Sequence, residues 1–125
     1  MATHFLNSRV IWLDSVDSTN EEAKRRIKGL SKPTWIISKK QSKGKGRNGN
    51  SWFSSEGNFS GSLTFFPTVE RAQFHLYGFF LAVALYNTLK KILKDDTDIR
   101  LKWPNDVLIE NGKVAGIFLE SIETN

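Results

Sequence analysis

The segment from Lys39 to Trp52 contains the densest group of residues that could bind an anion. It holds five cations, no acid and three glycines. Neighbouring cations repel one another unless an anion lies among them, so we expect a ligand that carries phosphate or carboxylate. Glycine lets a backbone approach a ligand closely, and we expect the segment to be loose when empty and ordered when filled. The five cations are Lys39, Lys40, Lys43, Lys45 and Arg47.

Within this segment, residues 44–49 match the spacing G-x-G-x-x-G. A dinucleotide site requires a helix to begin inside such a motif, and residues 50–55 are poor helix formers. A P-loop is excluded because no Ser or Thr follows Lys45. A flexible surface loop without a ligand is the alternative interpretation.

A second polar group is Asp17-Ser18-Thr19-Asn20. Ser18 and Glu21 have the spacing of a capping box, which predicts a helix that begins here. Hydroxyl and amide groups beside free backbone N–H donors would also suit a neutral polar ligand. Capping alone is the simpler interpretation of this segment taken by itself.

A third group, Lys102-Trp103-Pro104-Asn105-Asp106, follows a predicted strand. Turns favour Pro, Asn and Asp, so a turn with Trp103 in the core is one interpretation. Loops at strand ends are also where binding residues collect. Lys113 follows a predicted hairpin turn, where a solvated lysine is the ordinary expectation.

The elements that must position these groups can be predicted from hydrophobic periodicity and turn residues. Asn111-Gly112 between two apolar runs indicates a hairpin. Residues 79–86 are apolar nearly all round, which predicts a helix in the core against a sheet. We expect strands at 10–13, 35–38, 58–66, 99–103, 107–109 and 114–119, and helices at 18–29 and 71–94.

The composition restricts the class of protein. A chain of 125 residues suits one domain, and a net charge of +5 favours anionic partners without selecting one. Cysteine is absent and the two histidines, His4 and His75, are isolated, so we expect no disulfide, thiol nucleophile or metal site. The sequence shows no signal-peptide pattern and no run that spans a bilayer, so we expect a soluble cytoplasmic protein.

Taken in order, the motifs are D-S-T-N, K-K-Q-x-x-G-K-G-R-x-G-x-x-W, K-W-P-N-D and N-G-K-x-A-G-I. From about Val10 to about Glu120, the chain resembles the catalytic domain of biotin protein ligases (biotin–acetyl-CoA-carboxylase ligases). The resemblance implies an α+β fold in which a mixed, largely antiparallel sheet packs against helices. This is the fold of class II aminoacyl-tRNA synthetases and biotin ligases, and residues 1–125 would be the N-terminal portion of the domain, incomplete at the C-terminus.

The resemblance implies a two-step reaction. Biotin and ATP, with Mg²⁺, would give biotinyl-5′-adenylate and pyrophosphate, and biotin would then pass to a lysine of a biotin carboxyl carrier protein. Such chemistry needs cations from several segments and no protein nucleophile, which agrees with the lack of cysteine. No winged-helix DNA-binding domain is expected, so neither is a repressor role, and a homodimer is left open.

The resemblance also assigns roles to individual residues. Arg47 and Lys113 are expected to be catalytic, and no residue is expected to bind a metal directly. The residues expected to contact biotin are Ser18, Thr19, Asn20, Gln41, Gly44, Lys45, Gly46, Arg47, Lys113 and Gly116. The residues expected near ATP or the adenylate are Arg47, Trp52, Asn105 and Asp106.

Two departures from the family pattern are visible. Lys45, Asn48 and Asn50 occupy positions where arginine is common. A lysine lacks the planar fork that binds a carboxylate bidentately, so we expect weaker retention of the adenylate. The family domain also extends beyond the motifs found in these 125 residues. Two alternatives remain at this stage: a non-catalytic anion- or nucleic-acid-binding module with stacking on Trp52, and a lipoate or octanoyl transferase relative.

Overall fold

The computed structural model describes residues 7–124, so His4 lies outside the described residues. The described chain divides into two compact units. The first holds residues up to Phe66 together with 122–124, and the second is Pro67–Ser121. Each unit has its own three-stranded sheet and its own α-helix. None of the described helices is both long and apolar enough to cross a membrane.

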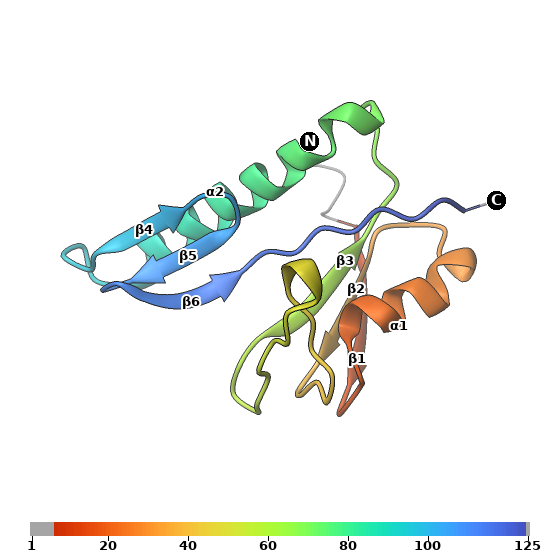
Figure 1. The fold of residues 1–125 in the computed structure, drawn as a ribbon, viewed down its shortest axis with the longest axis horizontal. Helices are drawn as coiled ribbons and strands as arrows, with labels where there is room; N and C mark the ends of the chain where they lie inside the picture. The colour runs from red at the N-terminus through yellow and green to blue at the C-terminus, as the bar shows by residue number, and fades with distance from the viewer. Residues whose placement is uncertain (1–6, 125) are drawn as a thin grey trace. The chain divides into compact units, whose positions relative to one another are not determined.

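The sheet of the first unit has the strand order β1-β2-β3. Strand β1 (Arg9–Leu13) runs parallel to β2 (Thr34–Ser38), and β3 (Ser60–Thr64) runs antiparallel to β2. Parallel neighbours need a crossover connection, which α1 (Thr19–Arg26) provides. Figure 1 shows α1 lying along one face of this sheet.

Helix α1 begins as the capping box predicts. Ser18 is the N-cap, with extended backbone angles, and its hydroxyl accepts a hydrogen bond from the Glu21 N–H at 3.5 Å. The first turn carries acids and the last turn carries bases, which suits the helix dipole. The α-helix ends at Arg26, three residues before the predicted end, and a 3₁₀ turn continues the helical segment to Gly29. Gly29 does not have the positive φ of a glycine cap, so the helical segment ends where predicted but not by the predicted cap.

The two faces of this sheet differ in chemistry. The α1 side is polar and buried, with Ser38 and Ser60 beside the fully buried Ile36. The opposite side is apolar and largely open, since Trp12 and Phe59 are 70% and 69% exposed. The predicted polar residues at the start of α1, Thr19 and Asn20, therefore lie on the buried, helix-covered side, where they contact Ser62.

The second unit is an antiparallel meander with a long helix. Strands β4 (Ile99–Lys102), β5 (Asp106–Ile109) and β6 (Gly112–Gly116) are paired in that order. The β5–β6 turn is built from Glu110 and Asn111, both with positive φ, of 47° and 67°. The hairpin is confirmed, with its turn one residue earlier than Asn-Gly would place it.

The prediction for residues 71–94 is wrong in two respects. A 3₁₀ turn at Arg71–Gln73 precedes α2 (His75–Ile92), so the segment is not one continuous α-helix. Helix α2 is also not buried all round. It packs on β4 and β5 and buries Tyr77, Gly78 and Ala82, because three short strands cover only one side of a helix of this length. Phe80 is 51% exposed on another side.

Candidate functional site

The start of α1 and the middle of β3 form a connected polar group in the first unit. Thr19 donates to Gln41 Oε1 from both its backbone N–H (2.7 Å) and its hydroxyl (3.1 Å). Ser62 Oγ lies 2.8 Å from Thr19 Oγ1 and also hydrogen-bonds Asn20 Oδ1. Ser18, Thr19 and Ser62 are buried. The arrangement offers hydroxyl and amide groups of both polarities at a helix start, which suits a neutral polar ligand.

A second layer of serines supports Gln41. The Gln41 backbone N–H donates to Ser54 Oγ at 3.3 Å, and Ser54 Oγ lies 2.6 Å from Ser60 Oγ. Gln41 is thus fixed at its backbone by one hydroxyl and at its side chain by Thr19. Such a network keeps side chains in one orientation when each polar atom has a partner.

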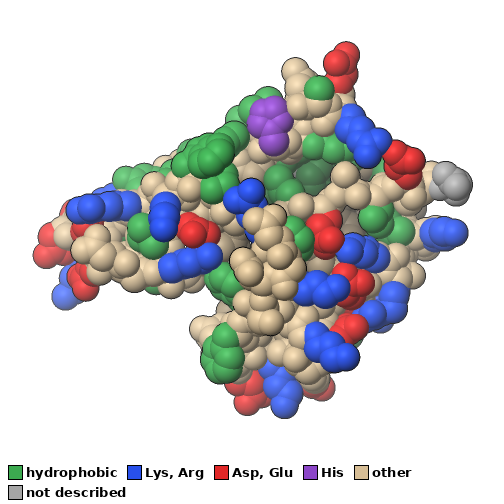
Figure 2. Space-filling view, viewed as in Figure 1, with side chains coloured by type: hydrophobic (Ala, Val, Ile, Leu, Met, Phe, Trp, Pro, Cys, Tyr) green, Lys and Arg blue, Asp and Glu red, His purple; other side chains and the backbone are tan. Residues whose placement is uncertain are grey.

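Asp17 orients the turn before α1 rather than facing a ligand. Both of its carboxylate oxygens accept from the Arg25 guanidinium, at 2.7 and 3.0 Å, and Oδ1 also accepts from the Ser18 N–H at 2.8 Å. The Arg25 hydrogen bonds, with the Ser18 N–H, hold the pKa of the Asp17 carboxyl well below its usual range. Figure 2 shows basic and acidic side chains interspersed over this part of the surface.

The glycine-rich segment forms a short hairpin across residues 44–52. The Trp52 N–H donates to Gly44 O at 2.8 Å, and the Gly46 N–H donates to Asn50 O at 2.7 Å. A 3₁₀ turn at Arg47–Gly49 closes it, with Asn48 at φ 56°. No α-helix begins inside the G-x-G-x-x-G motif, which agrees with the prediction that this motif is not a dinucleotide-binding site. That the segment loosens without ligand stays a prediction.

The base of this hairpin is attached to the residues before α1. The Lys43 N–H donates to Asp17 O at 2.7 Å, and the Ser42 N–H donates to Val16 O at 2.9 Å. Gly44 is buried, and a Cβ built on it would lie 2.5 Å from Trp52 O and 3.1 Å from Gln41 Nε2. Only glycine therefore lets the hairpin approach Gln41 this closely.

Two of the five cations are neutralised by acids of the first unit. Lys45 Nζ lies 2.9 Å from Glu21 Oε1, and Lys39 Nζ lies 2.7 Å from Asp14 Oδ1. The Lys45 hydrogen bond, followed by that of Lys24, lowers the pKa of Glu21. Within residues 7–124, the side chains of Lys40, Lys43 and Arg47 have no ion-pair partner, which leaves them available to an anion.

In the second unit, the predicted residues meet across β5 and β6. Lys113 Nζ lies 2.9 Å from Asp106 Oδ1. Asn105 Nδ2 donates to Ile117 O at 2.8 Å, and the Ile117 N–H donates to Asn105 O at 2.9 Å. Gly116 pairs with Asp106 in the strand register. Asn105 thus fixes the end of β6, while Asp106 and Lys113 present an opposite-charge pair.

Trp103 does not lie in the core of its unit, which corrects the simplest interpretation of the K-W-P-N-D turn. Its side chain is 78% exposed, and the Trp103–Pro104 peptide bond is cis. Strand β4 ends at Lys102, so Trp103 belongs to the turn that follows the strand.

The structure therefore brings the predicted residues together as two clusters, one in each unit. Sequence reasoning missed Ser62 as a partner of Thr19 and Asn20, and Glu21 as a partner of Lys45. The alternation of small polar residues along β3 was the available signal for Ser62. Glu21 was recognised only as a capping residue. The open hollow lined by Trp12, Ile37 and Phe59 lies on the apolar side of the sheet, away from Ser62.

In the described part of the chain, no three His, Cys, Asp or Glu side chains are grouped so that they could hold a metal ion.

Comparison with known proteins gives the family. Residues 12–125 match the family model described as the biotin/lipoate A/B protein ligase family. The chain belongs to this family. One relative, a biotin–[acetyl-CoA-carboxylase] ligase from Paracoccus denitrificans, is 41% identical over 109 residues, which cover 87% of this chain and 45% of the relative. The bifunctional ligase/repressor BirA of Escherichia coli is 34% identical over 110 residues, which cover 86% of this chain and 33% of the relative.

Solved structures of ligases share the fold. The Aquifex aeolicus biotin protein ligase in complex with biotin and ATP superposes with a TM-score of 0.78 at 34% identity, covering 90% of this chain and 47% of that one. The Helicobacter pylori biotin acetyl coenzyme A carboxylase synthetase, with bound biotinylated ATP, superposes with a TM-score of 0.74 at 26% identity. The match covers 94% of this chain and 56% of that one. The predicted α+β ligase fold is confirmed. The chain spans less than half the length of the curated relatives named above.

Proposed function

We propose that this chain takes part in biotin activation and transfer, as a biotin protein ligase or as the part of one that holds these motifs. Its substrates would be biotin and ATP, and its product biotinyl-5′-adenylate, from which biotin passes to a lysine of a biotin carboxyl carrier protein. The Paracoccus denitrificans relative is named as a biotin–[acetyl-CoA-carboxylase] ligase, and the Aquifex aeolicus biotin protein ligase was solved with biotin and ATP. Neither the nucleic-acid alternative nor the lipoate alternative gains support from these comparisons.

The observation that carries the proposal is the closed polar network at the start of α1. Ser62, Thr19 and Gln41 are linked at 2.8 and 3.1 Å, on a side of the sheet that is otherwise buried. A cyclic urea presents one carbonyl acceptor and two N–H donors, and these side chains offer both complements. We assign biotin's ureido ring to Ser18, Thr19, Asn20 and Gln41, with Ser62 added.

In the activation step, a biotin carboxylate oxygen would attack the α-phosphorus of ATP and pyrophosphate would leave. Two anions must approach each other, so the step depends on cations placed where charge develops. We assign this role to Arg47, which has no acid partner in the described chain, and to Lys113. Gly44, Gly46 and Lys45 would shape the hairpin near the carboxylate, and we also assign Gly116 to the biotin site.

We assign the nucleotide to Trp52, Asn105 and Asp106. Mg²⁺ usually binds through phosphate oxygens, water and one or two carboxylates. Asp106 supplies one such carboxylate, which is 19% exposed and already paired with Lys113. Asp106 would therefore lie near a metal that arrives on the phosphates of ATP, where the metal would neutralise phosphate charge.

In the transfer step, the lysine amine of the carrier would attack the acyl carbon of the adenylate and AMP would leave. The ordered hairpin would shield this reactive anhydride from water. We place the reaction in the cytoplasm, and the proposal covers only the ligase part of the ligase/repressor name.

Biotin-dependent exchange of labelled pyrophosphate into ATP tests the proposal directly, because it reports adenylate formation without a carrier. We expect exchange with biotin and none with lipoate, and a rise in the unfolding temperature when biotin is added. Absence of both exchange and biotin-dependent stabilisation would refute the proposal. Stabilisation without exchange would show a competent biotin pocket and would confine the proposal to binding.

A further inference from the structure

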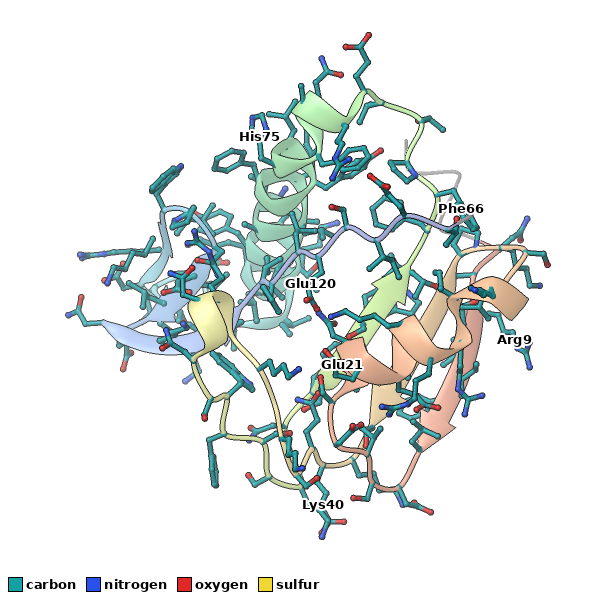
Figure 3. All side chains as sticks on the ribbon, turned by 45° about the vertical axis from the view of Figure 1, so that its right-hand side comes forward. Arg9, Glu21, Lys40, Phe66, His75 and Glu120 are labelled. Atoms are coloured by element: carbon teal, nitrogen blue, oxygen red, sulfur yellow. The ribbon has the colours of Figure 1, made fainter. Side chains whose placement is uncertain are left out.

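The cationic hairpin (residues 44–52) and helix α1 are joined by one side-chain ion pair. Lys45 Nζ on the hairpin lies 2.9 Å from Glu21 Oε1 in the first turn of α1. Figure 3 shows Glu21 beside the hairpin, which is drawn in yellow. The side chains are 48% and 28% exposed, so the contact is partly shielded from water.

The other cations of the segment do not share this contact. Lys39 pairs with Asp14, before α1, and Lys40 lies well away from Glu21 in Figure 3. Lys43 and Arg47 make no ion pair with any residue in 7–124. Among the described residues, Lys45 is therefore the hairpin cation that is already neutralised by α1.

Backbone hydrogen bonds connect the hairpin to the candidate site, so the ion pair can influence how that site is arranged. The base of the hairpin is bonded to Asp17 O through the Lys43 N–H, so the hairpin and the start of α1 are attached at one end by backbone. The Lys45–Glu21 pair adds a second attachment further along the hairpin. The backbone bonds at the base leave the far part of the hairpin held only by its own hydrogen bonds, so the ion pair restricts the angle at which that part lies against α1.

We propose that Glu21 is a positioning residue, whose ion pair with Lys45 holds the cationic hairpin beside the Ser18–Asn20 end of α1 and leaves Arg47 as the hairpin cation that meets the anionic ligand. The inference rests on the proposed function for the identity of that ligand. It also revises the expectation that Lys45 binds the ligand anion, because the Lys45 ammonium group is already paired with the Glu21 carboxylate. The ion pair itself is independent of any ligand.

The first test measures the hairpin without ligand. Amide hydrogen exchange would be recorded in the 125-residue chain for the Gly46 and Trp52 N–H groups, which close the hairpin. Glu21→Gln should increase their exchange about two- to fivefold, the change expected when a partly exposed ion pair is lost. Glu22→Gln is the matched control, because Glu22 neighbours Glu21 but pairs with Arg25 and Arg26. Equal exchange in the two variants would overturn the proposal.

A charge exchange guards against an effect on folding alone. Glu21→Lys should loosen the hairpin, and adding Lys45→Glu should restore protection of Gly46 and Trp52, because the pair is rebuilt with opposite signs. Glu21 also contacts Lys24 at 3.0 Å, so Lys24→Gln is included and should leave the hairpin protected. Failure of the double variant to restore protection would count against the ion pair as the cause.

The second test connects positioning to ligand binding. Biotin titration should give a Kd about two- to fivefold higher for Glu21→Gln than for Glu22→Gln, with recovery in the charge-exchanged variant. A changed hairpin with an unchanged Kd would overturn the positioning role. If the parent chain binds no biotin, the proposed function fails, whereas the exchange measurement still decides whether Glu21 holds the hairpin.

Discussion

Ser62 Oγ on β3 lies 2.8 Å from Thr19 Oγ1, the hydroxyl of the first residue of α1. The two residues are 43 positions apart in sequence, yet they are the first links of the polar chain that reaches Gln41. The helix start is therefore fixed to the sheet by side chains as well as by packing. Both residues are buried, so losing one partner leaves the other without a substitute from water.

Replacing Ser62 with Ala should weaken biotin binding about tenfold, because a lost hydrogen bond of this kind is worth roughly 1 to 1.5 kcal/mol. Calorimetric titration with biotin measures the change. Thr64→Val is the control on the same strand and face, since its hydroxyl bonds only the Thr34 carbonyl. Equal biotin affinity of the two variants would remove Ser62 from the site.

Arg47→Gln should lower kcat/KM for pyrophosphate exchange by about two to three orders of magnitude, as loss of a charge-stabilising group does. The hairpin should stay folded, because in the described structure the Arg47 side chain makes no ion pair there. Lys40→Gln removes a nearby cation for comparison and should change the rate little. Similar losses in both variants would indicate a general field effect instead of a role for Arg47.

Gly44→Ala should destabilise the hairpin by about 1 to 3 kcal/mol, the usual cost of overpacking. The new Cβ would lie 2.5 Å from Trp52 O, a backbone atom that cannot move alone. Chemical denaturation measures the loss. Gly29→Ala, where nothing lies within 4 Å of the new Cβ, should be near neutral. An unchanged free energy of unfolding in Gly44→Ala would contradict this prediction and show that the Gly44 and Trp52 backbones can move apart.

Lys113→Gln should reduce adenylate formation by at least about tenfold, because Asp106 loses a charged partner at 2.9 Å and a cation is removed from the reacting anions. Lys102→Gln is the comparison, because Lys102 pairs with Asp106 through the strand register and lies on a different strand from Lys113. Pyrophosphate exchange at saturating ATP and biotin measures the step. The exchange rate should fall more in Lys113→Gln than in Lys102→Gln. Equal losses in the two variants would contradict the role assigned to Lys113.

The first unit should lose stability in acid. The pKa values of Asp17, Glu21 and Glu22 are lowered, chiefly by hydrogen bonds from Arg25, Lys45 and Arg26 respectively. Carboxyls with lowered pKa stabilise the fold above their unfolded value of about 4, and this contribution is lost as pH falls through the folded values. Urea unfolding followed at α1 amides should be flat from about pH 7 to 5 and then decline. Asp17→Asn should make the decline shallower.

Much of this architecture was predictable because its signals are local. The Ser18 cap needs only Glu21 three residues later, and the Asn111 turn needs only its flanking strands. The Ser62–Thr19 and Glu21–Lys45 contacts join residues 43 and 24 positions apart, so no pattern of neighbouring residues predicts them. The exposure of Phe80 was missed for a related reason: an apolar sequence gives the preference of a helix, whereas burial depends on how many strands are present to cover it.

The two sheets differ in how far along the chain their partners lie, and this has a kinetic consequence. Strands β4, β5 and β6 are sequential antiparallel neighbours, whereas the parallel pairing of β1 with β2 must first close over α1. Contacts between distant residues form more slowly, because more chain entropy is lost before they are made. In refolding experiments, the meander should therefore acquire protection first, and the cationic hairpin, which depends on the parallel pair for its base, should be among the last segments to mature.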